Sequence, residues 1–129
     1  MKVPAFLLRR LYVKSSLRNV ESGFEFDLKN TLGSGYAERA LPLVVDDVEL
    51  PLSAARFVAD GEATLFEKVS AEHPMTLGMN RTVTVAVEGA PLVPGKHKLS
   101  IGFVVLGMGE MRFDVTDAIE EMPGGHHAA

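Results

Sequence analysis

The chain has 129 residues, which is enough for one domain with its own hydrophobic core and too few for two. Its 13 basic and 17 acidic residues are mixed along the sequence and give a net charge of -4, so there is no basic stripe for nucleic acid. No apolar run reaches the roughly 18 residues of a membrane-spanning helix. The absence of cysteine excludes disulfide scaffolds and thiolate catalysis and fits a reducing compartment, so we expect a cytoplasmic protein.

The first element along the chain is an apolar arm at residues 3–13, whose most apolar part contains Phe6, Leu7 and Leu8. Such a run is more apolar than one strand of a small sandwich needs. It therefore either caps the chain's own core or docks on another subunit, and both possibilities stay open. In the second case Phe6, Leu7 and Leu8 contact the partner.

Alternation of apolar and polar residues is the dominant pattern after the arm, beginning at residues 24–28. This period of two predicts strands with one buried and one solvent-facing side. No window shows a convincing helical repeat, although residues 53–57 or 66–71 can form one short turn of helix. The residues predicted to face inward are Phe24, Phe26, Leu28, Val83, Val85, Val87, His97, Leu99, Ile101, Phe103, Val105, Met111, Phe113 and Val115.

Turn residues separate these runs at spacings typical of hairpins, and roughly seven or eight short strands result. They predict an all-β fold, an antiparallel two-sheet sandwich of immunoglobulin-like type, with little or no helix. Residues 90–99 should cross between the sheets, and a C-terminal hairpin should follow at about residues 96–117. We expect a single domain at 1–121 and a flexible tail at 122–129. The predicted turns are Ser22-Gly23, Asp46-Asp47, Asp60-Gly61, Pro94-Gly95 and Gly107-Met108-Gly109.

The loop at residues 31–40 is a second candidate for contact with a partner. It carries Tyr36 and Arg39, residue types that are enriched at the energetic centres of interfaces. Its glycines Gly33 and Gly35 also invite comparison with phosphate-binding loops. A phosphate loop needs a helix directly after it, and the chain reaches Pro42 too soon for one. A plain connection between strands is therefore favoured.

Four histidines are the residues to test for catalysis or metal binding. His126 and His127 are adjacent in the tail, and two ligands alone do not set a metal geometry. His97 is in phase with the apolar face of its strand, which favours a hydrogen-bonded structural histidine. His73 stands in a predicted loop before a strand. We expect no metal site, no cofactor and no catalytic residue in this chain.

A pair of carboxylates is the other pattern with catalytic potential. Glu25 and Asp27 share one face of the same predicted strand, roughly 7 Å apart. A glycosidase needs two carboxyl groups at a defined separation across a cleft. The same spacing occurs on any solvent-facing strand, so solvated side chains are the favoured interpretation.

Residues 16–30, followed by residues 44–51, resemble the small β subunit of bacterial C-glycoside deglycosidases. The distinctive part is the strand Gly23-Phe24-Glu25-Phe26-Asp27. The resemblance implies a β-sandwich clamped to a larger barrel subunit similar to sugar isomerases. That barrel would hold a divalent metal and cleave the carbon-carbon glycosidic bond of a 3-oxo-glucoside by elimination. One departure is that residues 29–33 replace the arginine and paired aromatic residues usual in that family.

Three hypotheses follow. The first is a non-catalytic accessory subunit of such a metal-dependent lyase. The second is a self-associating module that binds a sugar or small metabolite, and the third is a small enzyme using His97 or His73 with a nearby carboxylate. The chain is also similar to short chains labelled hydroxymethylglutaryl-CoA reductase. We do not expect that chemistry, because the sequence has neither a dinucleotide fingerprint nor a paired acidic and lysine site.

Overall fold

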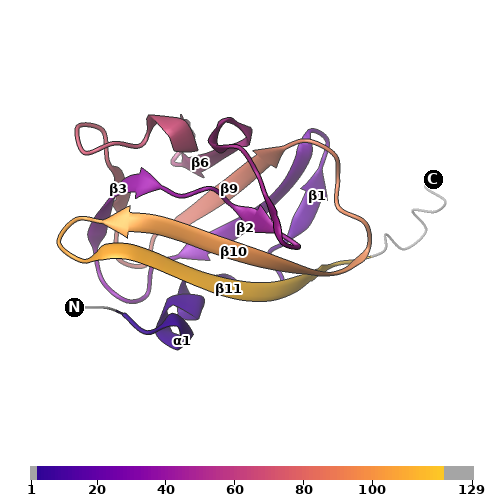
Figure 1. Cartoon of the computed structure of the whole chain (residues 1–129), viewed down its shortest axis with the longest axis horizontal. Coiled ribbons are helices and arrows are strands. Elements are labelled where there is room, and N and C mark those ends of the chain that lie inside the picture. Colours follow the sequence, from indigo (N-terminus) through magenta and orange to yellow (C-terminus); the bar gives the residue numbers. More distant parts are fainter. Residues whose placement is uncertain (1–2, 121–129) are drawn as a thin grey trace.

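Two antiparallel sheets pack face to face in the computed structural model, which describes residues 3–120 apart from the side chain of Leu77 (Figure 1). The predicted all-β sandwich is therefore confirmed. The predicted tail at 122–129, with His126 and His127, lies outside the described residues. None of the helices in residues 3–120 is long and apolar enough to cross a membrane.

The first sheet has the strand order β1-β2-β9-β6-β7. The predicted burial of Phe24, Phe26 and Leu28 in β2 is confirmed, with Phe26 fully enclosed. Gly23 opens β2 at a φ of 153°, where a Cβ atom would stand 2.0 Å from the carbonyl oxygen of Val87, so only glycine fits this turn. The strands are β1 (Arg18–Val20), β2 (Gly23–Lys29), β6 (Ala55–Ala59), β7 (Glu62–Leu65) and β9 (Thr82–Glu88).

The second sheet is built around β10, which pairs with β11 along one side and with β3 and β4 on the other. β5 extends the sheet beyond β4, and β8 extends it beyond β3. The chain crosses from β9 of the first sheet to β10 of the second, so the predicted crossing is confirmed, but residues 95–99 of the predicted stretch already belong to β10. The strands are β3 (Gly35–Ala40), β4 (Val44–Val45), β5 (Val48–Glu49), β8 (Met75–Leu77), β10 (Gly95–Val105) and β11 (Gly109–Ile119).

The C-terminal hairpin agrees closely with its prediction. β10 and β11 pair without interruption from Gly95 opposite Ile119 to Val105 opposite Gly109. Gly107 and Gly109 both have positive φ angles, 84° and 86°, which explains the glycines on either side of the tip. The inward side of β10 is buried from His97 to Val105, because alternation places every second residue against the other sheet.

Helix is confined to four short pieces within the described residues. The turns predicted near 53–57 and 66–71 correspond to η2 (Leu52–Ala54) and η3 (Phe66–Lys68). The N-terminal arm is also helical, with α1 (Ala5–Leu8) followed by η1 (Arg9–Leu11). The sequence pattern missed this helix, because a run of only seven residues is too short to show a helical repeat.

The arm closes the gap between the two sheets. α1 packs against β11, below which it lies in Figure 1. Tyr12 forms a bridge with Leu28 of β2, and its hydroxyl donates to Asp117 Oδ2 of β11 at 2.6 Å. The Tyr12 ring also lies 5.6 Å from that of Phe26 at the centre of the core. The arm therefore joins an element of one sheet to an element of the other.

Candidate functional site

The candidate partner residues Tyr36 and Arg39 point outward from β3 because of a β-bulge. Ala37 pairs with Val105 and Arg39 with the adjacent Val104, so Glu38 is an extra residue without its own partner. In a regular strand, two residues that are three positions apart, as Tyr36 and Arg39 are, point to opposite faces of the sheet. The extra residue restores Tyr36 and Arg39 to the exposed side while Ala37 is buried.

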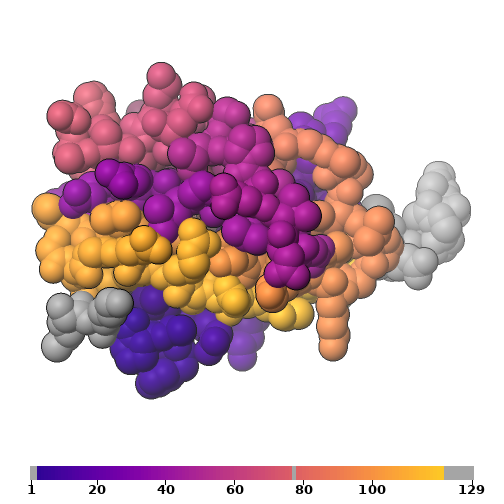
Figure 2. Space-filling view, viewed as in Figure 1, coloured from indigo at the N-terminus to yellow at the C-terminus, as the bar shows by residue number. Residues whose placement is uncertain are grey.

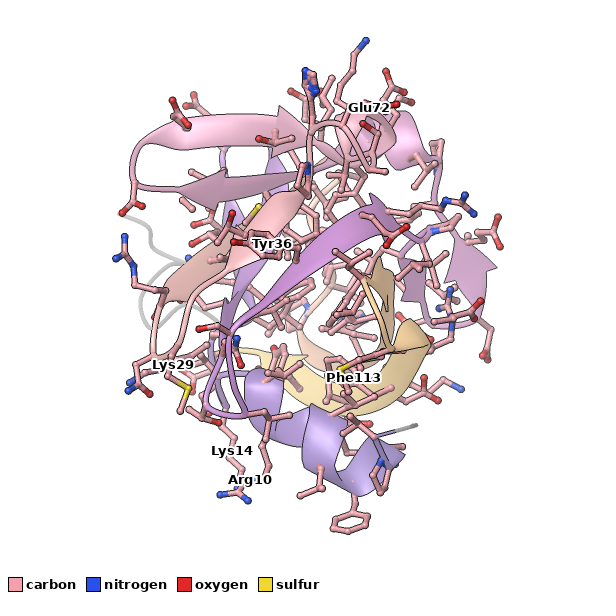
Figure 3. The ribbon with its side chains drawn as sticks, turned by 90° about the vertical axis from the view of Figure 1, so that its left-hand side faces the viewer. Arg10, Lys14, Lys29, Tyr36, Glu72 and Phe113 are labelled. Carbon is pink, nitrogen blue, oxygen red and sulfur yellow. The ribbon has the colours of Figure 1, made fainter. Side chains whose placement is uncertain are left out.

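Tyr36 belongs to a group of large apolar side chains that are exposed at one end of the sandwich. We call this group the end patch. Its members come from the loop before β3, from β3 itself, from the turn before β9 and from the tip of the β10–β11 hairpin. Figure 3 shows this end of the molecule with Tyr36 near its middle. The end patch consists of Leu32 (38% exposed), Tyr36 (51%), Met79 (50%), Leu106 (65%) and Met108 (37%).

Hydrogen bonds between the loops hold the end patch together. The backbone N–H of Leu106 donates to the Tyr36 carbonyl at 3.0 Å, which ties the hairpin tip to β3. The N–H of Met79 donates to Ser34 Oγ at 3.2 Å, which ties the turn before β9 to the loop before β3. The apolar side chains are thus presented by loops of fixed relative position, as a docking surface requires.

Asn30 shapes the loop that precedes β3. Its side-chain oxygen accepts from the N–H groups of Leu32 and Gly33, and its amide nitrogen donates to the Gly33 carbonyl at 2.5 Å. The loop predicted at residues 31–40 is confirmed only for residues 31–34, because β3 begins at Gly35. Tyr36 and Arg39 therefore stand in a strand that pairs with β10 and not in a loop. Sequence reasoning missed the role of Asn30, although a polar residue in phase with Phe26 and Leu28 was a signal for it.

The three candidate residues of the arm divide between core and surface. Leu8 is 3% exposed and packs in the chain's own core, whereas Phe6 is 65% exposed, and Leu7 is half-buried. α1 packs on β11, and β10 separates β11 from β3. The arm residues therefore lie in a helix against β11, and β10 separates β11 from the strand that carries Tyr36 and Arg39. In Figure 2 the arm, in indigo, lies below the C-terminal hairpin. The contact of the arm residues and of Tyr36 and Arg39 with a partner stays a prediction.

His97 is the structural histidine that its position predicted. It is 6% exposed, and its Nδ1 lies 2.6 Å from Asp46 Oδ2 while its Nε2 lies 2.7 Å from the Val93 carbonyl oxygen. Both partners are acceptors, so both ring nitrogens donate. The hydrogen bond to Val93 is the largest cause of the raised pKa of His97, and the hydrogen bond to Asp46 is the second. His97 in turn lowers the pKa of Asp46.

This geometry leaves His97 without a free nitrogen to serve as a base, which counts against the third hypothesis. Asp46 also accepts from the backbone N–H of Lys98 at 2.9 Å, so the same carboxylate fixes the start of β10. Asp46 and Asp47 form the predicted two-residue turn between β4 and β5, with φ angles of 50° and 69°. His73 is exposed in a separate turn closed on Ser70.

The carboxylate pair Glu25 and Asp27 is bridged by one arginine. Arg18 donates through Nε to Glu25 Oε1 at 2.9 Å and through Nη2 to Asp27 Oδ1 at 3.1 Å. Asp27 Oδ1 also accepts from the Thr84 hydroxyl at 2.8 Å. The hydrogen bond to Asp27, and after it the one to Glu25, raises the pKa of Arg18. These side-chain contacts link β2 to its neighbours β1 and β9, so the two carboxylates have a structural role.

Asp117 is a polar anchor that the sequence did not reveal. Besides the Tyr12 hydroxyl, it accepts from the N–H of Leu17 at 3.3 Å and from that of Ala118 at 2.8 Å. Burial, followed by the hydrogen bond to Asp117, raises the pKa of Tyr12. Within residues 3–120 no group of three or more acidic or histidine side chains is placed to hold a metal ion.

Comparison with known proteins gives one family. A comparison with curated proteins found no match. The model of the family described as hydroxymethylglutaryl-CoA reductase, N-terminal domain, matches residues 7–120. It differs from the family that the strand Gly23–Asp27 suggested, and no comparison supports a C-glycoside deglycosidase β subunit. Five alternating residues describe almost any half-buried strand, so they are a weak guide to family. The match spans nearly the whole sandwich, from α1 to the end of β11, and the chain belongs to this family.

Proposed function

We propose that the chain is a non-catalytic accessory subunit that binds a larger catalytic protein through its end patch. The observation that carries this proposal is the exposure of five large apolar side chains on loops that are hydrogen-bonded to one another. Exposed apolar groups gathered at one place mark docking surfaces more often than isolated ones do. Tyr36 and Arg39, both on the outward side of β3, supply residue types that dominate binding energy at interfaces.

The identity of the catalyst is the finer part of the proposal. We propose a metal-dependent barrel subunit that cleaves the carbon-carbon glycosidic bond of 3-oxo-C-glycosides and holds the divalent metal itself. This part rests on the resemblance of residues 16–30 and 44–51. The coarser part, a role beside a larger catalytic protein, rests on the exposed end patch. We place the complex in the cytoplasm, on the ground of the cysteine-free sequence.

The charge of the arm indicates what the facing surface of the partner looks like. The arm contains Arg9 and Arg10 and no acidic residue, and Lys14 follows it directly, although the whole chain carries a net charge of -4. Phe6 is exposed among them. An acidic partner surface would complement this segment, so association should slow as ionic strength rises.

A self-associating binding module is the alternative function, because a second copy of the chain can cover the end patch as well as a different protein can. The two cases differ in what the isolated chain does. An end patch that serves self-association gives dimers or larger oligomers of the pure chain at micromolar concentration. An end patch that serves a catalytic partner leaves the pure chain monomeric.

Measurement of the affinity of the chain for any barrel protein encoded beside it tests the proposal. Tyr36→Ala and Arg39→Ala should each weaken binding by roughly tenfold or more, since interface residues of these types often contribute about 1.4 kcal/mol or more. Val48→Ala is the matched control, because Val48 is 60% exposed but lies on β5, outside the end patch. No affinity of the unmodified chain for any barrel protein encoded beside it would refute the proposal.

A further inference from the structure

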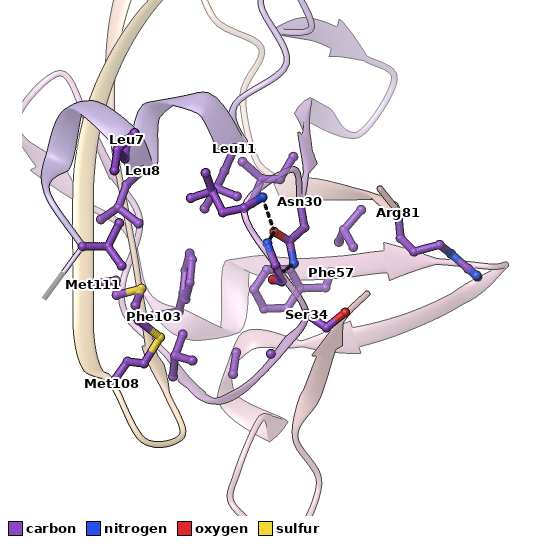
Figure 4. Close-up of a pocket in the computed structure, with 18 residues that line it drawn as sticks. Leu7, Leu8, Leu11, Asn30, Ser34, Phe57, Arg81, Phe103, Met108 and Met111 are labelled. Carbon is purple, nitrogen blue, oxygen red and sulfur yellow. Dashed lines mark hydrogen bonds between the residues drawn. The ribbon is translucent and has the colours of Figure 1, made fainter. Parts of the chain in front are cut away.

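A cavity of about 350 Å³ lies between the two sheets (Figure 4). The cavity is open to solvent on one side, and an apolar, partly enclosed space of this size is typical of sites that bind small molecules. Its walls come from both sheets and from the arm, which contributes Leu7, Leu8 and Leu11. The other apolar walls include Phe57, Val83, Phe103, Val105 and Met111.

The lining is enclosed except on one side. Phe57 and Val83 are each 5% exposed and Phe103 is 4% exposed, so these walls belong to the interior. The exposed lining residues include Leu32 and Met108, which stand in the loop before β3 and at the hairpin tip. The mouth of the cavity therefore lies between these two loops, at the end patch.

The polar groups of the lining are already engaged. Asn30 is bonded to the backbone of its own loop. Figure 4 shows the guanidinium of Arg81 pointing away from the cavity, and its Nη2 donates to Asp60 Oδ2 at 2.8 Å. No buried side-chain nitrogen or oxygen in residues 3–120 lacks a hydrogen-bond partner. The cavity can therefore recognise a ligand only by its shape and by apolar contact. A polar ligand would lose hydrogen bonds to water on entering and gain none.

The volume sets the size of the ligand. An apolar protein cavity of about 150 Å³ stays dry and binds benzene, so this one has room for roughly twice as many atoms. We propose that the cavity binds a small apolar ligand, an alkyl or acyl chain of roughly ten carbon atoms, which enters between the loop before β3 and the hairpin tip. A hydroxyl or carboxylate at the end of the chain stays in water at the mouth.

Methyl resonances of the methionines report directly on this site. Met108 and Met111 line the cavity, whereas Met79 is 50% exposed in the end patch and is not part of the lining. Titration of the full-length protein with decan-1-ol should shift the methyl signals of Met108 and Met111 saturably and leave Met79 nearly unchanged. Hexan-1-ol should bind more than about tenfold more weakly, because each lost methylene removes apolar contact. Glucose should shift neither lining methionine.

Substitutions that fill the cavity test the same proposal by mutation, because they should exclude the ligand. Val83→Phe adds a ring inside the cavity and should weaken decan-1-ol binding by at least about tenfold while leaving the melting temperature equal or higher. Val93→Phe makes the same change at a residue that is 68% exposed and outside the lining, so it should bind as the unmodified protein does. Ala37→Val, a smaller change in the opposite wall of the cavity, serves if Val83→Phe does not fold.

The outcomes separate clearly. Saturable shifts at Met108 and Met111 that Val83→Phe or Ala37→Val weakens support the inference. Shifts of Met79 as large as those of Met111 indicate adsorption to the end patch and overturn it. The absence of any saturable shift, or unchanged binding by the filled variant, overturns it as well.

Discussion

The two ends of β10 differ in how their side chains are satisfied. Near Gly95 the ring of His97 is enclosed, and each of its nitrogens has an acceptor, so this end is complete within the chain. At the other end the hairpin tip exposes Leu106 and Met108 beside an apolar cavity. Polar groups whose hydrogen bonds are all made within the chain have a structural role. Apolar groups that stay exposed on hydrogen-bonded loops indicate instead a surface that binds another molecule.

The largest expected effect concerns the arm, because its helix carries both a buried apolar side chain, Leu8, and an exposed one, Phe6. Leu8→Ala should lower the free energy of unfolding by about 2 to 5 kcal/mol, because the side chain is buried in the core. Phe6→Ala should change it by less than about 0.5 kcal/mol, because Phe6 is exposed. Urea denaturation of both variants measures the difference. Equal losses from the two substitutions would show that α1 is not anchored as described.

His97→Ala should have the next largest effect. It removes both hydrogen bonds of the ring and leaves the Val93 carbonyl without its donor, so we expect a loss of about 1 to 3 kcal/mol. Thermal and urea unfolding measure it, with His73→Ala as the control, because His73 is exposed in its turn. A loss no larger than that of the control would mean that this end of β10 is not held by His97.

A smaller effect is expected from pH. The pKa of His97 is raised above its usual value near 6.5, so its contribution to stability is complete below about pH 6.5 and is lost as pH rises through the folded-state pKa. The pKa of Asp46 is lowered, so its contribution is present above about pH 4 and is lost as pH falls through its folded-state pKa. The melting temperature should fall as pH is raised from 6 to 9.

His97→Gln should reduce this decline at alkaline pH, because glutamine does not titrate. An unchanged decline in the variant would assign the pH dependence to other groups.

The smallest effect is expected at the opposite end of β10. Leu106→Ser should change the free energy of unfolding by less than about 0.5 kcal/mol, because the Leu106 side chain is 65% exposed. The same substitution should weaken partner binding, since Leu106 belongs to the end patch. A large loss of stability in the isolated chain would instead assign Leu106 to the fold.

The strands could be predicted because a half-buried strand alternates apolar and polar residues, and this alternation is visible in the sequence. The inward series of Phe24, Phe26 and Leu28 and the glycines at the hairpin tip each carry a local signal, and the structure agrees with them. His97 was predictable for the same reason, since it lies in phase with its apolar neighbours. Its acceptor Asp46 was not, because it stands 51 residues away on another strand pair.

The candidate site depended on features with no local signal. The bulge at Glu38 decides that Tyr36 and Arg39 share a side, and a bulge depends on pairing with β10 rather than on the sequence of β3 alone. The arm's helix is too short for a period to show. The cavity depends on residues from both sheets that meet only after folding. The five-residue strand did not indicate the family whose model matches the chain, because alternation is shared by unrelated sandwiches.

Native mass spectrometry of the untagged protein isolated from its own cells tests the central claim most directly. The account predicts that this 13.9 kDa chain is found in a stoichiometric complex with a larger, metal-containing protein. The complex should weaken when Tyr36 is replaced by alanine. A chain recovered only as a monomer or as a homo-oligomer would contradict the accessory-subunit function.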